Sequence, residues 1–444
     1  MGLPEAEEPR RQDLENGNDE HESLQQLPPA DGGRQAWCFL FAISLFEAVI
    51  WGLPYAFGVF QDYYLTNPPV SNNPTGISAI GTTTLGLMYF LAPFLALAMQ
   101  RYPYARTPCM IAGLVITAAA LIGASFCNNV PGLISTQGVL YAIGSVLAYF
   151  PGMQIIDEWF IKRRAFAFAV VWAAAPLAGC VLPFLMQWLL DSYGFRVALR
   201  VYAVVVVVLL GPATVWIKPR IPITQSWKTL SREDFAFMAH RPFWWYFIGT
   251  VVQSLGFFLP SLWMPTFAKY YNFPGFAGPL GVALYYSSSF IGTVVQGWVV
   301  DQRGVIISLA ITTVVSTISV FVFWGLSTLQ PIFYIFAVTF GASGGAYNAT
   351  WAGFAIDLKN EGFKVDTMFL ITLMVFAKGV ASLASGPLSE GLHGHGLGTD
   401  SGFAYGGPYG VMIVYTGICS LLGGVACVRK FYQWLQKRKS ANSS

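Results

Sequence analysis

The 444-residue chain has few charged residues: Asp, Glu, Lys and Arg make up 11% of it, whereas hydrophobic residues make up 55%. Its mean hydropathy is +0.54. A soluble domain needs far more charge to cover its surface, so this chain cannot hide its apolar residues in a water-soluble core. We therefore expect lipid to be its solvent.

Motifs of soluble catalysis are missing as well. The sequence contains no Walker loop, no Gly-x-Ser-x-Gly nucleophile motif and no zinc-binding spacing. Its six cysteines show no Cys-x-x-Cys spacing and lie mostly in apolar runs, which indicates packing residues rather than disulfides. We predict no enzyme, no cofactor, no metal site, no ATP-driven transport and no nucleic-acid partner.

A signal peptide is also lacking. Residues 1–33 have no apolar core region and are rich in Glu, Asp, Gln and Pro, so we expect a disordered cytoplasmic tail. No retention or lipidation signal is present. The first apolar run is then the insertion signal, and the plasma membrane is the default location of a multi-pass membrane protein.

What the chain does contain is a series of apolar runs long enough to cross a bilayer. Each should be helical, because backbone groups in hydrocarbon need partners within the same segment. The polar stretch 218–242 divides the runs into two sets of six. The predicted spans are 36–60, 76–98, 107–126, 131–153, 166–190, 197–217, 243–267, 278–300, 304–325, 331–355, 367–388 and 408–428.

This pattern predicts an all-α membrane protein with twelve transmembrane helices in two six-helix bundles. The expected parts are a tail at 1–33, bundles at 34–217 and 243–429, a cytoplasmic central loop at 218–242 and a basic cytoplasmic tail at 430–444. Cytoplasmic loops carry an excess of Lys and Arg. With the N-terminus in the cytoplasm, the opposite loops hold only Arg196, Arg200 and Lys269 of 25 basic residues, so both termini are predicted to be cytoplasmic.

Two stretches around the fifth span are similar to a known transporter family. Trp159–Arg164 reads aromatic-Phe-x-Lys-Arg-Arg, and Leu189–Arg196 reads Leu-Leu-Asp-x-Tyr-Gly-aromatic-Arg. Both resemble the monocarboxylate porter branch of the major facilitator superfamily, and Asp31–Gly33 and Glu47–Tyr64 are similar to its fungal members. The resemblance covers most of residues 31–428. It implies a secondary transporter that works by alternating access between two six-helix halves.

The superfamily's loop signature is only partly present. In Gly-x-x-x-Asp-[Arg/Lys]-x-Gly-[Arg/Lys], Gly297 and Asp301 match, while the basic residue is shifted to Arg303. In the family this loop latches the two halves on the cytoplasmic side, so the resemblance implies gating roles for Asp301 and Arg303. The alternative is a solvated loop that only sets topology.

Residues of the lactate-carrying members are replaced here. Their eighth-helix Asp and Arg fall on Ser289 and Thr293, and their first-helix Lys falls on Tyr55. The resemblance therefore does not carry over the proton–lactate machinery of those members.

Two charged residues stand near the middle of predicted spans, Glu47 in the first and Lys378 in the eleventh. A charge at the bilayer centre costs about 2.5–3.5 kcal/mol on insertion scales, so such residues usually face the bundle interior and serve a function. Glu47 is the predicted proton carrier, because a carboxyl group favours its neutral form when desolvated and releases the proton in a wetter state. Lys378 is expected to attract an anionic substrate. The structural alternatives are a hydrogen-bonded neutral Glu47 and a Lys378 paired with an acid, Glu47 included.

Helical spacing adds candidate substrate contacts on spans one, four, seven and ten, which line the central path in this superfamily. Residues three or four apart share a helix face. The predicted substrate-binding residues are Trp51, Tyr55, Gln137, Tyr141, Gln253, Phe257, Asn348, Trp351 and Lys378. Their mixture of hydrogen-bonding groups and flat rings suits a weak organic acid or an amphiphilic metabolite better than a bare ion. For each aromatic residue, core packing is the alternative.

Two transport hypotheses follow, both with a small-molecule substrate, protons and the lipid bilayer as partners. The first is proton-coupled movement of a small organic acid, with Glu47 as proton carrier and Lys378 as charge partner. The second is efflux of an aromatic or polyketide-like secondary metabolite, favoured by the missing Asp–Arg pair and the aromatic-rich spans. A non-transporting nutrient receptor is less favoured, because such receptors tend to carry long cytoplasmic segments and only about sixteen residues follow Val428.

Overall fold

The computed structural model describes residues 28–161, 163–221, 232–365, 367–398 and 403–430, which are helical and include no strand. The two predicted tails, up to residue 27 and from 431 onward, lie largely outside the described residues. Of the predicted central loop at 218–242, only 222–231 lies outside them, and the described remainder includes a 3-10 turn, Arg232–Ala239. Lys162 of the basic motif before the fifth span also lies outside them.

Sixteen α-helices make up most of the described structure. They are α2 (Gly33–Tyr55), α3 (Phe57–Thr66), α4 (Ile77–Arg101), α5 (Arg106–Ala124), α6 (Val130–Leu133), α7 (Tyr141–Met153), α8 (Ile156–Trp159), α9 (Arg164–Val205), α10 (Gly211–Ala213), α11 (Arg241–Tyr270), α12 (Ala277–Arg303), α13 (Val305–Ile318), α14 (Gln330–Gly344), α15 (Thr350–Asn360), α16 (Thr367–Leu392) and α17 (Gly410–Leu422). Short 3-10 or π-helical turns join or extend them. These turns are η1 (Val70–Asn72), η2 (Pro103–Ala105), η3 (Ile134–Leu140), η4 (Val206–Leu210), η5 (Thr214–Trp216), η6 (Arg232–Ala239), η7 (Ser319–Trp324), η8 (Gly345–Ala349) and η9 (Phe403–Gly406).

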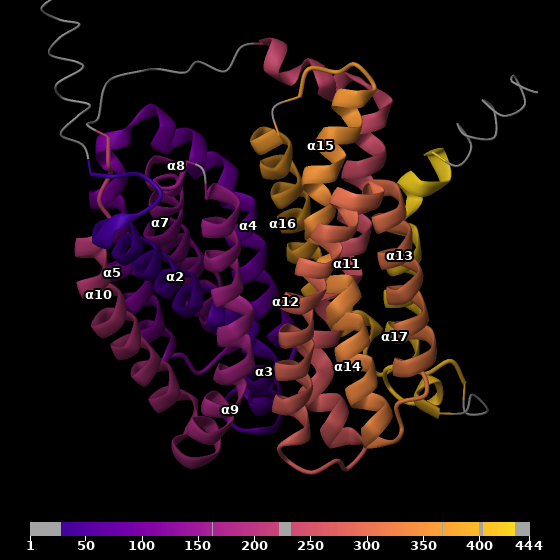
Figure 1. The fold of residues 1–444 in the computed structure, drawn as a ribbon. Helices are drawn as coiled ribbons and strands as arrows, with labels where there is room; N and C mark the ends of the chain where they lie inside the picture. Colours follow the sequence, from indigo (N-terminus) through magenta and orange to yellow (C-terminus); the bar gives the residue numbers. More distant parts are fainter. Residues whose placement is uncertain (1–27, 162, 222–231, 366, 399–402, 431–444) are drawn as a thin grey trace, which may run out of the picture.

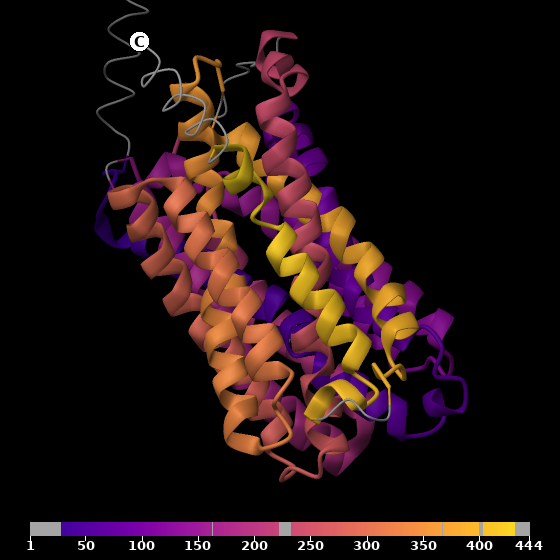
Figure 2. The same ribbon diagram turned by 90° about the vertical axis from the view of Figure 1, so that its right-hand side faces the viewer.

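The helices form one elongated bundle with two sides. Figure 1 shows the helices up to α10 on one side and those from α11 onward on the other. Figure 2 shows the long helices running along a shared direction, and both described chain ends lie at the same end of the bundle. We call this end the basic end, because Arg101, Arg106, Arg241, Arg303 and Lys359 stand at helix termini there. The other end is the far end.

Nine helical stretches of the described chain are long and apolar enough to cross a membrane. The predicted spans 278–300 and 331–355 are not among them, so the count of twelve stays a prediction. The predicted spans 166–190 and 197–217 lie in one continuous helical stretch. Within α9 the non-helical residue is Gly194, with φ 78° and ψ 169°, a conformation that glycine adopts without steric cost.

Close packing of α12 against α14 depends on glycine. A Cβ atom at Gly292 would overlap the carbonyl group of Ala342, and one at Gly341 would overlap the carbonyl oxygen of Tyr285. In lipid, where apolar side chains gain little by leaving the solvent, small residues hold helices together by allowing close van der Waals contact.

Replacing Gly292 by alanine should therefore destabilise the protein by about 1–3 kcal/mol, the usual cost of overpacking. Thermal unfolding of the purified protein in detergent measures this effect. Gly297→Ala is the matched control, because Gly297 lies on the same helix and a Cβ atom there would meet no atom within 4 Å. Equal melting temperatures for the two variants would refute the packing role of Gly292.

Candidate functional site

Glu47 is a buried carboxyl group without a charged partner among the described residues. It lies in the middle of α2, is 6% exposed, and its Oε2 atom has no hydrogen bond to any described residue. Three tyrosines, Tyr55, Tyr89 and Tyr149, are close enough to interact electrostatically with it. The Tyr149 hydroxyl is a hydrogen-bonding neighbour of this carboxyl group, although the two do not meet strict hydrogen-bond geometry. Unpaired buried polar groups are rare in folded proteins, so this cluster is a candidate site for a proton or a ligand.

An aromatic wall continues from this carboxyl group along α2. The ring of Trp51 lies 4.8 Å from that of Tyr89, and its indole N–H has no acceptor among the described residues. Tyr55, one turn further on, stacks on Tyr286 of α12 at 4.5 Å with an interplanar angle of 7°. Tyr55 therefore contacts the opposite side of the bundle, in addition to lying near Glu47.

Lys378 of α16 is a buried cation surrounded by rings. It is 3% exposed, and its Nζ atom donates to Oδ1 of Asn348 at 3.3 Å. The centroids of Phe257, Tyr89 and Phe258 lie 4.7, 5.1 and 5.3 Å from Nζ. In the described part of the chain no carboxylate lies within 4.0 Å of it. Ring contacts offset part of the desolvation cost of the ammonium group, but they leave its charge unneutralised.

Glu47 and Lys378 do not form the ion pair that the sequence allowed. Each is instead a neighbour of Tyr89: Glu47 acts electrostatically on its hydroxyl group, and Lys378 lies over its ring. The structure thus brings Trp51, Tyr55 and Lys378 of the predicted set around Tyr89 of α4. Phe257 and Asn348 join this cluster through their contacts with Lys378.

Three predicted substrate contacts are instead used for packing within one side of the bundle. Gln137 accepts a hydrogen bond from the Tyr64 hydroxyl at 2.9 Å. Tyr141 donates to a backbone carbonyl of α2 at 2.8 Å, and Gln253 donates to a backbone carbonyl at the end of α14 at 3.1 Å. Because these groups already have partners, their role in substrate binding remains only a prediction.

Trp351 and the two predicted gating residues lie toward the basic end. Trp351 is buried in a hydrophobic cluster with Tyr246 and Phe354, and its indole N–H has no acceptor among the described residues. Asp301 and Arg303 are exposed at the end of α12, and neither forms an ion pair with a described residue. Their gating role also stays a prediction.

Four residues of the central cluster were not predicted from the sequence: Tyr89, Tyr149, Phe258 and Tyr286. Tyr149 could have been found, because steps of four from Tyr141 lead through Ser145 to it on the same face of α7. Tyr89 and Tyr286 lie on α4 and α12, spans that were not considered as lining the path.

The far end is closed by contacts between the two sides. The Glu390 carboxylate of α16 accepts hydrogen bonds from the backbone N–H groups of Gly76 and Ser78, both at 2.7 Å, at the N-terminus of α4. Such a terminus favours a negative charge. Asp62 of α3 pairs with Lys269 of α11 at 3.5 Å. The space beside the Tyr55–Tyr286 stack has a volume of only about 10 Å³.

At the basic end, ion pairs join helices of the same side. Arg106 pairs with Glu158 at 2.9 Å on one side, and Lys430 pairs with Asp357 at 2.7 Å on the other. Figure 1 shows the ribbons of the two sides diverging toward this end and converging toward the far end. The arrangement is therefore closed at the far end.

Comparisons with known proteins agree with this architecture. The profile of the family described as Major Facilitator Superfamily matches residues 35–384. The MFS-type transporter pytF of Aspergillus terreus is 27% identical over 282 residues, which cover 62% of this chain and 93% of that protein. The Aspyridones efflux protein apdF of Emericella nidulans is 25% identical over 334 residues, covering 74% and 66% of the two chains. The crystal structure of the nucleoside transporter NupG has a TM-score of 0.65 at 13% identity, covers 89% of this chain and 99% of its own, and shows likeness of fold alone.

Proposed function

The chain belongs to the Major Facilitator Superfamily, and from that premise we propose that it exports a flat, weakly acidic aromatic metabolite in exchange for protons. Transport itself follows from the family and from relatives that are transporters rather than enzymes. The substrate class, the direction and the proton coupling are the proposal. We also propose that the chain is a member of the fungal monocarboxylate porter-like branch.

The observation that carries the proposal is the unneutralised Lys378 among three aromatic rings. An ammonium group has three donors, and only one described acceptor, Asn348, lies within reach of this one. An anionic oxygen of a substrate would supply the missing acceptor and charge. The rings of Phe257 and Tyr89 would then contact a flat apolar body.

Glu47 supports the coupling to protons. Its carboxyl group shares Tyr89 with the proposed anion site but does not neutralise Lys378. Release of a proton from Glu47 would add negative charge near the bound anion, and uptake of a proton would remove it. Protonation of Glu47 and binding of the anion thereby favour each other, and antiport further requires that the protein reorient only when it holds either the proton or the anion.

The proposed direction of transport is inferred from the orientation of the chain in the membrane. Because the basic end carries most of the Lys and Arg residues, we place it and both termini in the cytoplasm. The closed far end then faces outward, and the arrangement receives substrate from the cytoplasm. We further propose that twelve helices form two halves, 34–217 and 243–429, and that Asp301 and Arg303 form a gate. The proposed location is the plasma membrane. The name of the Aspyridones efflux protein supports export of an organic metabolite.

Proton-coupled movement of a small carboxylate is the second candidate, because Lys378 and Glu47 suit it equally well. The aromatic walls weigh against it, since a substrate of two or three carbons leaves most ring surface without contact.

Transport into proteoliposomes with an acidic lumen tests the proposal. The membrane potential is clamped with K⁺ and valinomycin, and the substrates are 4-hydroxycoumarin, its neutral analogue coumarin, and lactate. Antiport should concentrate 4-hydroxycoumarin at least fivefold in the acidic lumen, from which passive diffusion excludes weak acids. Coumarin and lactate should not accumulate.

Protein-free liposomes are the control for passive distribution. Accumulation of lactate in vesicles with an alkaline lumen, without any effect on 4-hydroxycoumarin, would establish the small-carboxylate alternative. Failure of every substrate to accumulate would contradict both.

A further inference from the structure

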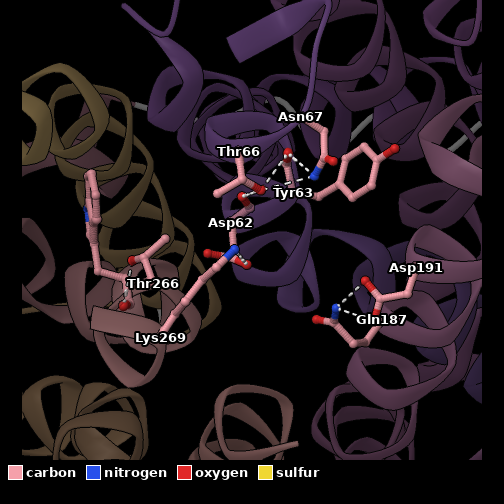
Figure 3. A network of polar contacts seen from close by, with 9 residues as sticks. Asp62, Tyr63, Thr66, Asn67, Gln187, Asp191, Thr266 and Lys269 are labelled. Atoms are coloured by element: carbon pink, nitrogen blue, oxygen red, sulfur yellow. Dashed lines mark hydrogen bonds and ion pairs between the residues drawn. The ribbon is translucent and has the colours of Figure 1, made fainter. Parts of the chain in front are cut away.

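A second candidate site lies at the far end, away from Glu47 and Lys378. A partly open cavity of about 450 Å³ is lined there by α3 and α9 from one side of the bundle and by α11 and α12 from the other. This volume falls within the range of small-molecule pockets, about 300–1,000 Å³. None of the residues predicted to bind substrate lines it. Figure 3 shows the polar side chains around this space.

The cavity carries more negative than positive charge. Both carboxylate oxygens of Asp191 accept hydrogen bonds from Nε2 of Gln187, at 2.8 Å each, and this donor is a neutral amide of the same helix. No described cation lies within 4.0 Å of Asp191. Across the cavity, Asp62 is paired with Lys269 at 3.5 Å. Figure 3 shows Lys269 reaching to Asp62, while Gln187 and Asp191 lie apart from this ion pair. The cavity thus holds two carboxylates and one ammonium group, and the Asp191 carboxylate has no positively charged partner among the described residues.

Open aromatic rings stand beside this unneutralised carboxylate. Phe184 and Trp188 of α9 line the cavity together with Phe276, which precedes α12. They are 40%, 56% and 55% exposed, so their ring surfaces are available for contact. Trp188 lies one turn before Asp191 on α9, which places ring and carboxylate on the same helix face. A cation over an aromatic ring is attracted by the ring's negative face.

We propose that this far-end cavity is a binding site for protonated aromatic amines. The ammonium group lies against Asp191, and the aromatic group contacts Trp188 and Phe276. The unneutralised Asp191 carboxylate repels anions, so this site selects cations. The site proposed at Lys378, in contrast, selects anions. The inference is independent of the identity of the transported substrate.

Occupation of this site has a consequence for transport. The walls come from both sides of the bundle, so a ligand contacts all of them only while the far end is closed. A ligand that binds one conformation better shifts the population toward it. Aromatic amines should therefore slow transport by stabilising the far-end-closed state.

Equilibrium dialysis of the full-length protein in lipid nanodiscs tests the site, with radiolabelled 2-phenylethylamine as the probe. Its neutral analogue 2-phenylethanol and its anionic analogue 3-phenylpropanoate are the competitors. The amine should bind at least tenfold more tightly than either analogue. Asp191→Asn should weaken amine binding at least tenfold, and Trp188→Leu at least threefold. Trp172→Leu is the matched control, because Trp172 is an exposed ring of α9 outside the cavity.

Three outcomes would overturn the proposal. The first is an absence of saturable amine binding, and the second is equal affinity for the amine and the alcohol in the unchanged protein, a comparison that needs no variant to fold. The third is amine binding that is lost in Glu47→Gln but retained in Asp191→Asn, which would place the amine at the central carboxyl group.

Discussion

Replacing Glu47 by glutamine is expected to abolish gradient-driven accumulation of 4-hydroxycoumarin in proteoliposomes, with a loss of at least tenfold. Glutamine keeps the size of the side chain and replaces the titratable carboxyl group by an amide that does not titrate. Because Glu47 has no charged partner in the described structure, the change breaks no ion pair and should leave the fold intact. The loss would therefore reflect proton coupling rather than unfolding.

The measurement combines two assays of the same preparation. Substrate-dependent proton release, followed with a pH-sensitive dye in the lumen, should disappear in Glu47→Gln. Exchange of labelled for unlabelled 4-hydroxycoumarin at equal pH should continue within about threefold of the unchanged protein, because exchange needs no net proton movement. If gradient-driven accumulation survives in Glu47→Gln, Glu47 is not the proton carrier. If exchange is lost as well, the residue is structural or binds substrate directly.

Replacing Lys378 by methionine is expected to weaken binding of 4-hydroxycoumarin at least tenfold while leaving the affinity for neutral coumarin within about twofold. Methionine retains an unbranched apolar stem and removes the ammonium group that would face the anion. A buried charge without a partner is costly, so the variant should be at least as stable as the unchanged protein. Equilibrium dialysis with the two coumarins measures the difference directly.

Lys359→Met is the matched control, because Lys359 is exposed at the end of α15 and, among the described residues, donates a hydrogen bond to Thr367. It should leave both affinities unchanged. Equal losses for 4-hydroxycoumarin and coumarin in Lys378→Met would indicate a distorted pocket. An unchanged affinity for both would reduce Lys378 to a packing residue held by its three rings.

Much of the architecture was predictable, because it depends on local properties of the chain. The shortage of charge and the long apolar runs predict helices in lipid. The patterns at Trp159–Arg164 and Leu189–Arg196 resemble the superfamily to which the chain belongs. The finer assignment to its monocarboxylate porter-like branch remains a proposal.

The candidate site was predictable only where a residue is unusual in itself. Glu47 and Lys378 stand out in sequence because charges are rare within membrane spans. Spacing along one helix was a weaker guide. It selected Gln137, Tyr141 and Gln253, whose polar groups are taken up by packing within their own side of the bundle.

The sequence by itself determined that the chain lies in lipid, that its fold is helical and that Glu47 and Lys378 are charged residues within membrane spans. These properties follow from composition and periodicity, which can be read from short segments. Only the tertiary structure decided that Glu47 and Lys378 form no ion pair, that both are neighbours of Tyr89 and that a cavity opens at the far end. These features depend on how closely helices approach and how each is rotated. Contacts such as Gly379 of α16 against the backbone of Phe90 set that approach, and such contacts join residues almost three hundred positions apart.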